Sequence, residues 1–211
     1  MSHCAITVLV VDDHPVVRAG LVALLSVQPT LRVVGEAADG ASAITAAGQL
    51  RPDVILSDLR LGEGPDGVEV TRAVRAGTGL VPAVLILTTY DHDADLVRAV
   101  EAGAAGYLLK DAAPTVIVAA IEAAARGESV LGPELTERVV ASMRIRRADL
   151  SARELEVLRL VAHGLSNRDV ARHLVVSEAT VKTHLNHVFA KLHVESRTAA
   201  VASARGAGLI D

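Results

Sequence analysis

Short apolar runs alternate with alanine-rich amphipathic segments over the first 126 residues of the chain. The runs are rich in Val, Leu and Ile, which is typical of strands that are buried on both faces of a parallel sheet. The segments between them have the spacing of apolar residues expected of helices that cover such a sheet. This region is therefore predicted to be of the α/β class, with a five-stranded, doubly wound parallel sheet. The strands are expected near 6–11, 32–37, 53–57, 83–87 and 106–109, and the helices near 15–27, 40–50, 67–76, 93–102 and 114–126.

The pattern changes after residue 126. Residues 127–149 are predicted to form a linker with a short helix near 133–145. In the stretch LSARELEVL, Ser151 is placed to cap a helix, and Glu154 is placed to complete a capping box. No strand pattern follows, so residues 150–211 are expected to form a small all-α domain. Its four helices are expected near 152–162, 167–173, 178–191 and 196–206.

The two regions differ in charge. Residues 1–143 carry 10 Lys and Arg against 18 Asp and Glu, a net charge of −8, whereas residues 144–211 carry 11 against 7, a net charge of +4. A basic region joined to an acidic one indicates that nucleic acid binds at the basic end. Because the chain has two Tyr, one Phe and no Trp, we do not expect bases to stack on aromatic side chains.

Cysteine usage and hydropathy predict the compartment. Cys4 is the single cysteine, so the chain can form no internal disulfide, and no Cys/His cluster has the spacing of a zinc site. No apolar run approaches the roughly 20 residues of a membrane span, and the N-terminus lacks the pattern of a signal peptide. We therefore expect a cytoplasmic protein with no membrane partner.

Several predicted strands end in polar side chains that can act together. The first strand delivers Asp12 and Asp13, the third delivers Asp58, the fourth delivers Thr88 and the fifth delivers Lys110. The carboxyl ends of parallel strands lie at one edge of a sheet, where ligands of such folds bind. Carboxylates that crowd together repel one another unless a cation neutralises them, and a set of oxygen ligands suits Mg²⁺. The sequence therefore predicts a magnesium site at this edge.

The same residues indicate phosphoryl chemistry. A Lys and a Thr hydroxyl beside a metal-bound carboxylate are suitable donors to phosphoryl oxygens, so Asp58 could act as a nucleophile and form an aspartyl phosphate. A single aspartate at the end of a strand is often only a helix N-cap. The meeting of these strand ends favours a catalytic site over a set of caps.

The stretches VLVVDDHPVVRAGL, DVILSDLR, VLILTTYD and AGAAGYLLKD resemble the receiver domain of two-component response regulators, in order and spacing, across 1–126. The resemblance implies a flavodoxin-like fold and a sensor histidine kinase as partner. It implies that Asp58 is the phosphoacceptor, that Lys110 binds the phosphate, and that Thr88 and Tyr107 form a switch pair. The Mg²⁺ ligands it implies are Asp13, Asp58 and the backbone carbonyl of Arg60, with Asp12 acting largely through water.

The loop after Asp58 departs from the family pattern. Family members often have a Met-Pro-Gly turn there, whereas this chain has LRLGEGPDG, which lacks Pro at that place and is one residue longer. The loop also contains GEGPDG, which satisfies the dinucleotide-binding pattern G-x-G-x-x-G. We discount that interpretation because Glu63 and Asp66 would repel a pyrophosphate and because no ribose-binding acid follows at the required distance.

The segment VVSEATVKTHLNHVFAKL is predicted to be an amphipathic helix. Val181, Leu185, Val188 and Leu192 form one apolar stripe, and the opposite side exposes polar residues that can reach base edges in a major groove. This segment and its surroundings closely resemble the LuxR-type helix-turn-helix of NarL/FixJ regulators over about 60 residues. The resemblance makes 178–191 the recognition helix. It directs Lys182, Thr183 and Asn186 toward bases, and Thr180, His184 and Lys191 toward phosphates.

This region also contains a pair of histidines and a stripe of small residues. His184 and His187 are three residues apart on one helix, but no third ligand accompanies them, so we predict no metal there. The last helix carries small apolar residues that would allow two helices to approach closely, and we predict a dimer contact at Ala200, Val201 and Ala204. Packing within its own domain is the alternative.

The sequence thus predicts a phosphorylation-regulated DNA-binding transcriptional regulator, with a receiver domain over 1–126, the linker, and an output domain over 150–211. It would bind promoter DNA as a homodimer on activation, and RNA polymerase is a further candidate partner. We do not expect an enzyme beyond Mg²⁺-dependent self-phosphorylation and autodephosphorylation at Asp58. A phosphohydrolase of the haloacid-dehalogenase type would need an aspartate where Arg60 stands. A pseudo-receiver would lack part of the acidic, Thr and Lys set.

Overall fold

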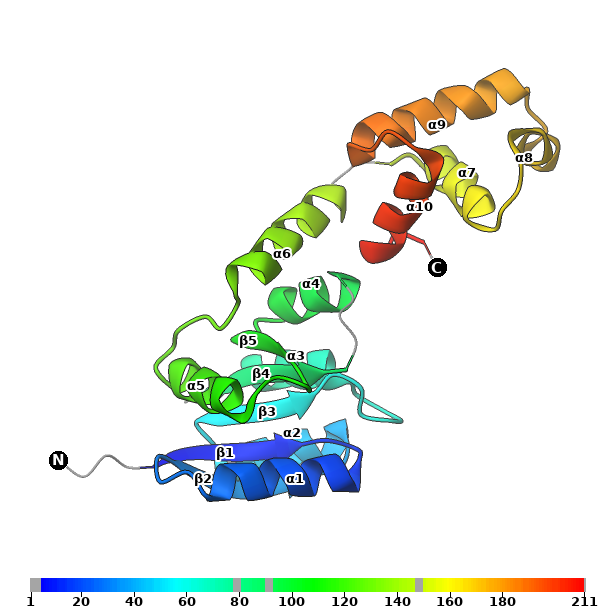
Figure 1. Cartoon of the computed structure of the whole chain (residues 1–211). Helices are drawn as coiled ribbons and strands as arrows, with labels where there is room; N and C mark the ends of the chain where they lie inside the picture. Colours follow the sequence, from blue (N-terminus) through cyan, green and yellow to red (C-terminus); the bar gives the residue numbers. More distant parts are fainter. Residues whose placement is uncertain (1–4, 78–80, 90–92, 147–149, 211) are drawn as a thin grey trace. The chain divides into compact units, whose positions relative to one another are not determined.

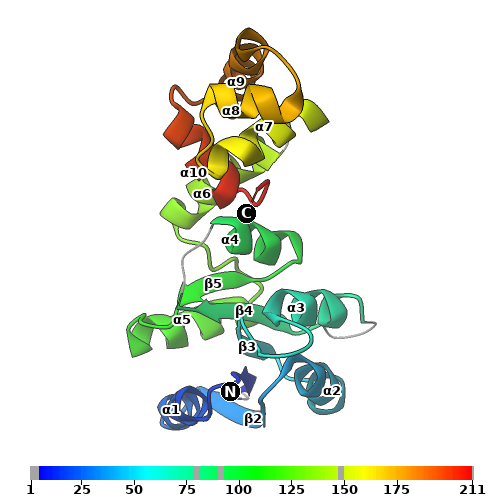
Figure 2. The ribbon, with the colours of Figure 1, turned by 90° about the vertical axis from the view of Figure 1, so that its right-hand side faces the viewer.

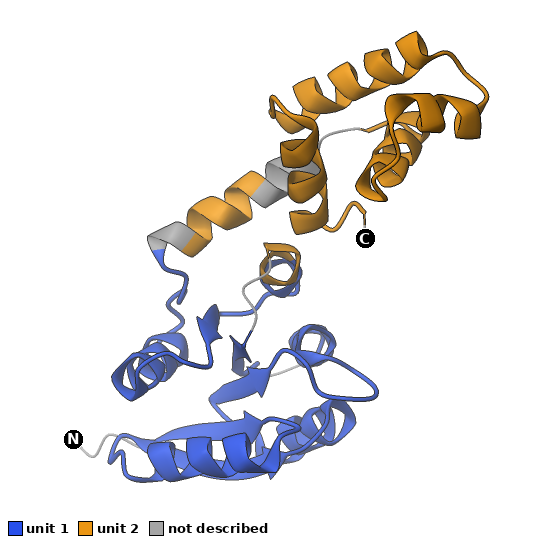
Figure 3. Cartoon of the chain, turned by 45° about the vertical axis from the view of Figure 1, so that its right-hand side comes forward, with its two compact units in different colours: residues 1–91, 98–133 blue, residues 92–97, 134–211 orange. Residues whose placement is uncertain are grey.

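A computed structural model describes residues 5–77, 81–89, 93–146 and 150–210. The chain divides into two compact units, coloured separately in Figure 3. The first comprises residues 1–91 and 98–133, and the second comprises residues 92–97 and 134–211. Each unit is described by itself below.

The first unit is built on a five-stranded parallel sheet with the strand order β2-β1-β3-β4-β5. The central pairings are regular, with Val8 opposite Val54 and Leu56 opposite Leu85. The predicted class and all five predicted strands are confirmed, with ends that differ by at most one residue. The strands are β1 (Ile6–Val11), β2 (Leu31–Ala37), β3 (Val54–Asp58), β4 (Ala83–Thr88) and β5 (Gly106–Leu109).

Helices cover both faces of this sheet. Figure 2 shows α1 and α5 on one side of the sheet and α2 and α3 on the other. The helices begin at residues suited to that position: Pro15 and Pro114 occupy the first turns of α1 and α5, and the Asp39 side chain caps α2. The helices are α1 (Pro15–Ser26), α2 (Gly40–Leu50), α3 (Gly67–Arg75), α4 (Asp93–Glu101) and α5 (Pro114–Ala125).

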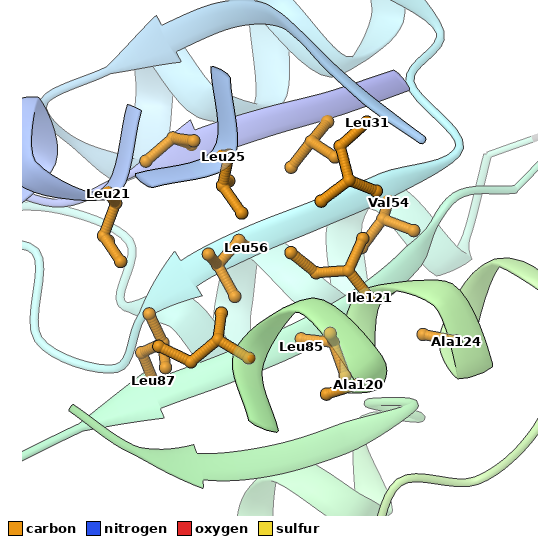
Figure 4. Packing of buried hydrophobic residues seen from close by; sticks show 13 residues of the cluster. Leu21, Leu25, Leu31, Val54, Leu56, Leu85, Leu87, Ala120, Ile121 and Ala124 are labelled. Carbon is orange, nitrogen blue, oxygen red and sulfur yellow. The ribbon is translucent and has the colours of Figure 1, made fainter. Parts of the chain in front are cut away.

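The core under α1 and α5 is made of aliphatic side chains (Figure 4). Leu25 from α1 and Ile121 from α5 are fully buried over the strands, together with Leu56 and Leu85 from the sheet. Full burial of one such side chain contributes about 1.5–3 kcal/mol. This packing fixes the strands, and therefore the positions at which their carboxyl ends deliver polar side chains.

The second unit contains the first residues of α4, one helix that falls within the predicted linker, and a domain of four helices (Figure 1). Each helix of that domain follows a serine whose hydroxyl accepts a hydrogen bond from the backbone amide three residues later. Ser196 takes this capping role with an extended backbone, so the last helix begins one residue later than predicted. The helices are α6 (Pro133–Arg146), α7 (Ala152–Ala162), α8 (Asn167–Leu174), α9 (Glu178–Leu192) and α10 (Arg197–Gly206).

The position of α10 corrects the predicted dimer contact. Ala200 and Ala204 are both 0% exposed, because they pack against Leu158 and Leu192 in the core of their own domain. The prediction is therefore wrong for these two alanines, which have no surface to offer a partner. Val201 is partly buried against the same core, so only part of its side chain is available for the contact still predicted there.

Among the residues that the structure describes, no helix has the length and the apolar character needed to cross a membrane.

Candidate functional site

The carboxyl ends of β1 and β3 bring the predicted aspartates together. Asp12 and Asp13 follow β1, and Asp58 is the last residue of β3, which lies beside β1 in the sheet. One potential ligand atom from each of Asp12, Asp13, Asp58 and His14 lies within 4.8 Å of all the others. Asp12 is fully buried and Asp58 is 5% exposed, so burial raises the cost of the charge that these groups share.

Lys110 reaches this cluster from the end of β5. Its backbone amide donates to the carbonyl of Thr88 at 2.8 Å, which ties the end of β5 to the end of β4. Its Nζ lies 2.6 Å from Oδ2 of Asp58 and 2.7 Å from Oδ2 of Asp12. One ammonium group thus lies against two buried carboxylates, as the sequence predicted for the edge of the sheet.

The pKa values follow from this crowding. Burial raises the pKa of the Asp58 carboxyl above its ordinary value, and the hydrogen bond from Lys110 offsets only part of that effect. Burial alone would lower the pKa of Lys110, but its close contacts with the carboxylates of Asp12 and Asp58 outweigh burial and raise it. The two shifts have different main causes, burial for Asp58 and the neighbouring carboxylates for Lys110, and the charge of Asp12 adds to the first. A further cation would relieve this excess of negative charge.

The residues present fit a hard divalent cation. Oδ2 of Asp12 is buried and receives no well-aligned hydrogen bond from the described residues, although Lys110 Nζ lies close to it. Asp13 keeps 28% of its side chain exposed, so the cluster opens to solvent on that side. Carboxylate oxygens with an open side suit Mg²⁺, which retains several waters when bound to protein.

The atypical loop after β3 passes beside the cluster. The backbone amide of Arg60 points at Oδ1 of Asp58 at 3.4 Å. Gly62 and Gly64 have φ values of 67° and 97°, which glycine adopts without strain. The stretch GEGPDG ends at the first residue of α3, where Asp66 and Glu69 form a capping box with each other's backbone amides. Carboxylates therefore occupy the helix N-terminus that a pyrophosphate would need.

The predicted switch pair is buried. Thr88, the last residue of β4, is 1% exposed, and Tyr107 of β5 is also 1% exposed. Ile86 is paired with Tyr107 and Thr88 with Leu109, so the two residues lie on neighbouring strands. An inward position of Tyr107 is thus already present in this structure.

Two residues near the cluster were not predicted. His14 Nδ1 lies 2.7 Å from Oδ1 of Asp13, and the His14 amide donates to Oδ1 of Asp12 at 2.8 Å. Arg18 donates from Nη1 to the carbonyl of Asp12 at 2.6 Å. The adjacency of His14 to the two aspartates was a usable signal. The role of Arg18 depends on the first turn of α1 and could not be seen in the sequence.

The second predicted site lies on α9. The stripe of Val181, Leu185, Val188 and Leu192 is buried, as the apolar spacing predicted. Lys182, Thr183 and Asn186 are exposed. The helix thus buries one face and presents polar side chains on the other.

The side chains predicted to lie near phosphates differ in their surroundings. His184 is partly exposed. The Thr180 hydroxyl lies 2.8 Å from the Ser177 hydroxyl at the N-cap, and so belongs to the start of α9. Lys191 Nζ lies 2.7 Å from Oε2 of Glu154, a buried carboxylate on α7. A phosphate contact by Lys191 would have to compete with that ion pair.

Both regions of the chain, the one with the carboxylate cluster and the one with α9, match known protein families. Residues 8–122 match the family described as response regulator receiver domain, and residues 148–204 match the bacterial regulatory proteins of the luxR family. The chain therefore belongs to the response regulators that join a receiver domain to a LuxR-type DNA-binding domain.

Individual relatives span nearly the whole chain. The nitrate/nitrite response regulator NarL of Escherichia coli K12 is 40% identical over 92% of each chain. The crystal structure of ChrA, a response regulator of a heme-sensing two-component system, is 47% identical, with a TM-score of 0.55 over 98% of this chain and 99% of the other. A structure of two RcsB dimers bound to two DNAs is 26% identical, with a TM-score of 0.71 over 96% and 99%.

Proposed function

We propose that Asp58 accepts a phosphoryl group from a sensor histidine kinase and that this modification controls DNA binding by the second unit. The observation that carries the proposal is the meeting of Asp12, Asp13, Asp58 and Lys110 at one end of the parallel sheet. A buried carboxylate between an ammonium group and further carboxylates has no evident structural purpose. It is suited to attack a phosphoryl group whose oxygens the ammonium group can hold.

Mg²⁺ would be held by Asp13, Asp58 and the carbonyl of Arg60, with Asp12 acting largely through water. When bound, the ion supplies positive charge to phosphoryl oxygens and offsets the repulsion among the carboxylates. An Oδ atom of Asp58 forms the new bond to phosphorus, and the donor's leaving group departs with the electrons of the bond that breaks. Lys110 neutralises a phosphoryl oxygen, and the hydroxyl of Thr88 donates a hydrogen bond to another.

The output unit would bind promoter DNA through α9. Lys182, Thr183 and Asn186 are exposed opposite the buried stripe, which is the arrangement needed to reach base edges in a major groove. A homodimer on two half-sites is proposed because one small domain makes a small interface with DNA. The linker over 127–149 would join the receiver domain over 1–126 to the output domain over 150–211.

Phosphorylation is tested with the intact chain, Mg²⁺ and a small phosphodonor such as phosphoramidate. We expect one added phosphoryl group per chain, labile to hydroxylamine as an acyl phosphate is, and no addition in Asp58→Asn. Asp111→Asn is the matched control, because it removes an exposed carboxylate next to Lys110 and should label normally. Full labelling of Asp58→Asn would refute Asp58 as the acceptor.

Control of DNA binding is tested on a duplex that the phosphorylated protein has selected from a random-sequence pool. Phosphorylation should increase both the affinity for this duplex and the population of dimer in sedimentation. If the labelled protein showed unchanged mass and unchanged affinity, Asp58 would remain a phosphoacceptor, but its proposed control of the output unit would be refuted.

A further inference from the structure

One carboxylate joins the start of α7 to the end of α9. Glu154 has 5% of its side chain exposed, and its Oε2 accepts from the backbone amide of Ser151 at 2.7 Å. The same oxygen accepts from Nζ of Lys191, also at 2.7 Å. His187, one turn before Lys191 on α9, places Nδ1 3.6 Å from the other oxygen, Oε1. The carboxylate of α7 thus faces two side chains of the predicted recognition helix.

Apolar contacts and a charged contact both join these helices. Leu158 of α7 packs with Val188 and Leu192 of α9 in one buried cluster. Apolar packing is non-directional, whereas a charged hydrogen bond requires particular distances and angles. The pair of Glu154 and Lys191 is therefore a directional contact that adds to the apolar packing in fixing how α9 is rotated about its own axis against α7.

That rotation determines where the exposed side chains of α9 point. Lys182 and Asn186 lie on the turns that precede Lys191, on the side of α9 away from the buried stripe. Successive residues of a helix are separated by about 100°, so a small rotation of the helix displaces every exposed side chain sideways. A base contact tolerates little displacement because bidentate hydrogen bonds require close alignment.

We propose that Glu154 is a positioning residue for DNA recognition, which acts through Lys191 to fix the orientation of the recognition helix. Lys191 then serves as the partner of Glu154 rather than as a phosphate ligand. The inference rests on the proposed binding of DNA by α9, and it deepens that function by adding two residues that need not touch a base.

The electrostatics of the pair agree with this role. Burial alone would raise the pKa of Glu154, but hydrogen bonds from Lys191 and Ser151 outweigh burial and hold the pKa below its ordinary value. The carboxylate is therefore charged at neutral pH. If Lys191 turned away to a phosphate, a buried charge would lose its closest cation, and breaking such a pair is costly.

The test compares Lys191→Met, Glu154→Gln and the double variant in the full chain. The glutamine keeps an oxygen that can accept from Ser151, so the capping box is retained and only the charge is lost. Glu156→Gln is the matched control: it makes the same change of charge two residues further on in α7, at a side chain that is 51% exposed and pairs with Arg153. The DNA probes are a duplex selected by the wild-type protein from a random-sequence pool, and poly(dI-dC).

Each single variant should bind the selected duplex roughly 10- to 100-fold more weakly, because loss of the contact displaces the side chains that must align with base edges. The double variant should bind no more weakly than either single variant, because each single variant already removes the same contact between Glu154 and Lys191. Binding to poly(dI-dC) and the slope of log affinity against log salt should stay unchanged, and Lys191→Arg should restore most of the affinity. Glu156→Gln should bind the selected duplex as tightly as the wild type.

A direct phosphate contact by Lys191 gives a different result. Lys191→Met would then weaken both DNAs alike and reduce the salt slope by about 0.9, the value for one phosphate contact on duplex DNA. Glu154→Gln, which frees Lys191, would leave affinity unchanged or raise it. Either observation would overturn the positioning role.

Hydrogen exchange of α9 amides without DNA separates this inference from the proposed function. Faster exchange in the last turns of α9 is expected in Glu154→Gln and Lys191→Met, but not in Glu156→Gln. If the wild-type protein bound no duplex, the proposed function would fail while the exchange data still reported on the contact. Unchanged exchange in both variants would show that the pair does not hold the helix.

Discussion

The Cα of Gly67 lies so close to Asp58 that a Cβ at Gly67 would stand 2.3 Å from the backbone carbonyl oxygen of Asp58. Backbone atoms on both sides make this approach rigid, since the Gly67 amide also donates to the carbonyl of Leu59 at 2.9 Å. The first residue of α3 is thereby pressed against the end of β3. The absence of a side chain at Gly67 helps to hold the carboxylate of Asp58 at the edge of the sheet.

Gly67→Ala should therefore destabilise the protein and displace Asp58. A forced contact of this kind in a packed region costs about 1–3 kcal/mol, and the rate of phosphorylation should fall as well. Gly48→Ala in α2 is the matched control, because nothing lies within 4 Å of a Cβ there and alanine favours a helix. Denaturant unfolding measures both variants. Equal stability of the two would show that the backbone near Asp58 yields easily.

The crowding of carboxylates predicts that the site is stabilised by removing one of them. Burial and the neighbouring Asp12 raise the pKa of Asp58, so its charged form destabilises the folded protein in the absence of a cation. Asp58→Asn should therefore raise the free energy of unfolding in buffer with a chelator.

Mg²⁺ should make the wild-type protein more stable than Asp58→Asn. The ion should stabilise the wild-type protein and have little effect on Asp58→Asn, because binding to the native state alone adds to its stability. Thermal unfolding with and without Mg²⁺ measures the difference. A wild-type protein that Mg²⁺ left unaffected would argue against a metal site at these residues.

The sequence predicted those features that repeat or that depend on residue type. The alternation of apolar runs placed all the strands of the sheet, and the spacing of Val181, Leu185, Val188 and Leu192 identified the buried face of α9. Asp58 and Lys110 could be placed together because parallel strands end at a common edge.

Features that depend on which helices meet could not be predicted in this way. A stripe containing Ala200 and Ala204 looks the same whether it faces a second chain or its own core, and only the packing of α10 decides. Lys191 looked like an exposed cation because its partner, Glu154, is distant in the sequence and on another helix. From the sequence, Glu154 was recognised as part of a local capping box and not as the partner of Lys191.

The stability of the second unit should depend on pH through Glu154. Burial raises the pKa of this carboxyl, but hydrogen bonds from Lys191 and Ser151 hold it below its ordinary value of 4.5. Because the folded-state pKa is the lower one, the contribution of Glu154 is fully present above pH 4.5 and is lost as the pH falls through the folded-state pKa. The difference in unfolding free energy between the wild type and Glu154→Gln should therefore become smaller as the pH falls below 4.5.

The other carboxylates are the same in both proteins, so their contributions to the pH dependence cancel in this difference. Glu156→Gln provides the control. Its own difference from the wild type should be small at every pH, because the carboxylate of Glu156 is exposed and its pair with Arg153 is worth little. Denaturant unfolding at a series of pH values measures both. A difference for Glu154→Gln that stayed constant down to pH 3 would mean that the carboxylate makes no net contribution through its charge.

Base recognition by α9 should depend on Lys182 and Asn186, whose side chains are exposed opposite the buried stripe. Lys182→Ala and Asn186→Ala should each cost about 1–3 kcal/mol of binding to the selected duplex if they contact base edges, and much less on poly(dI-dC). Arg32→Ala removes the same charge as Lys182→Ala from an exposed position on β2, in the other unit, and should leave both affinities unchanged. Equal losses on both DNAs for Lys182→Ala and Asn186→Ala would mean that this face of α9 contacts only the phosphate backbone, and that sequence is read elsewhere.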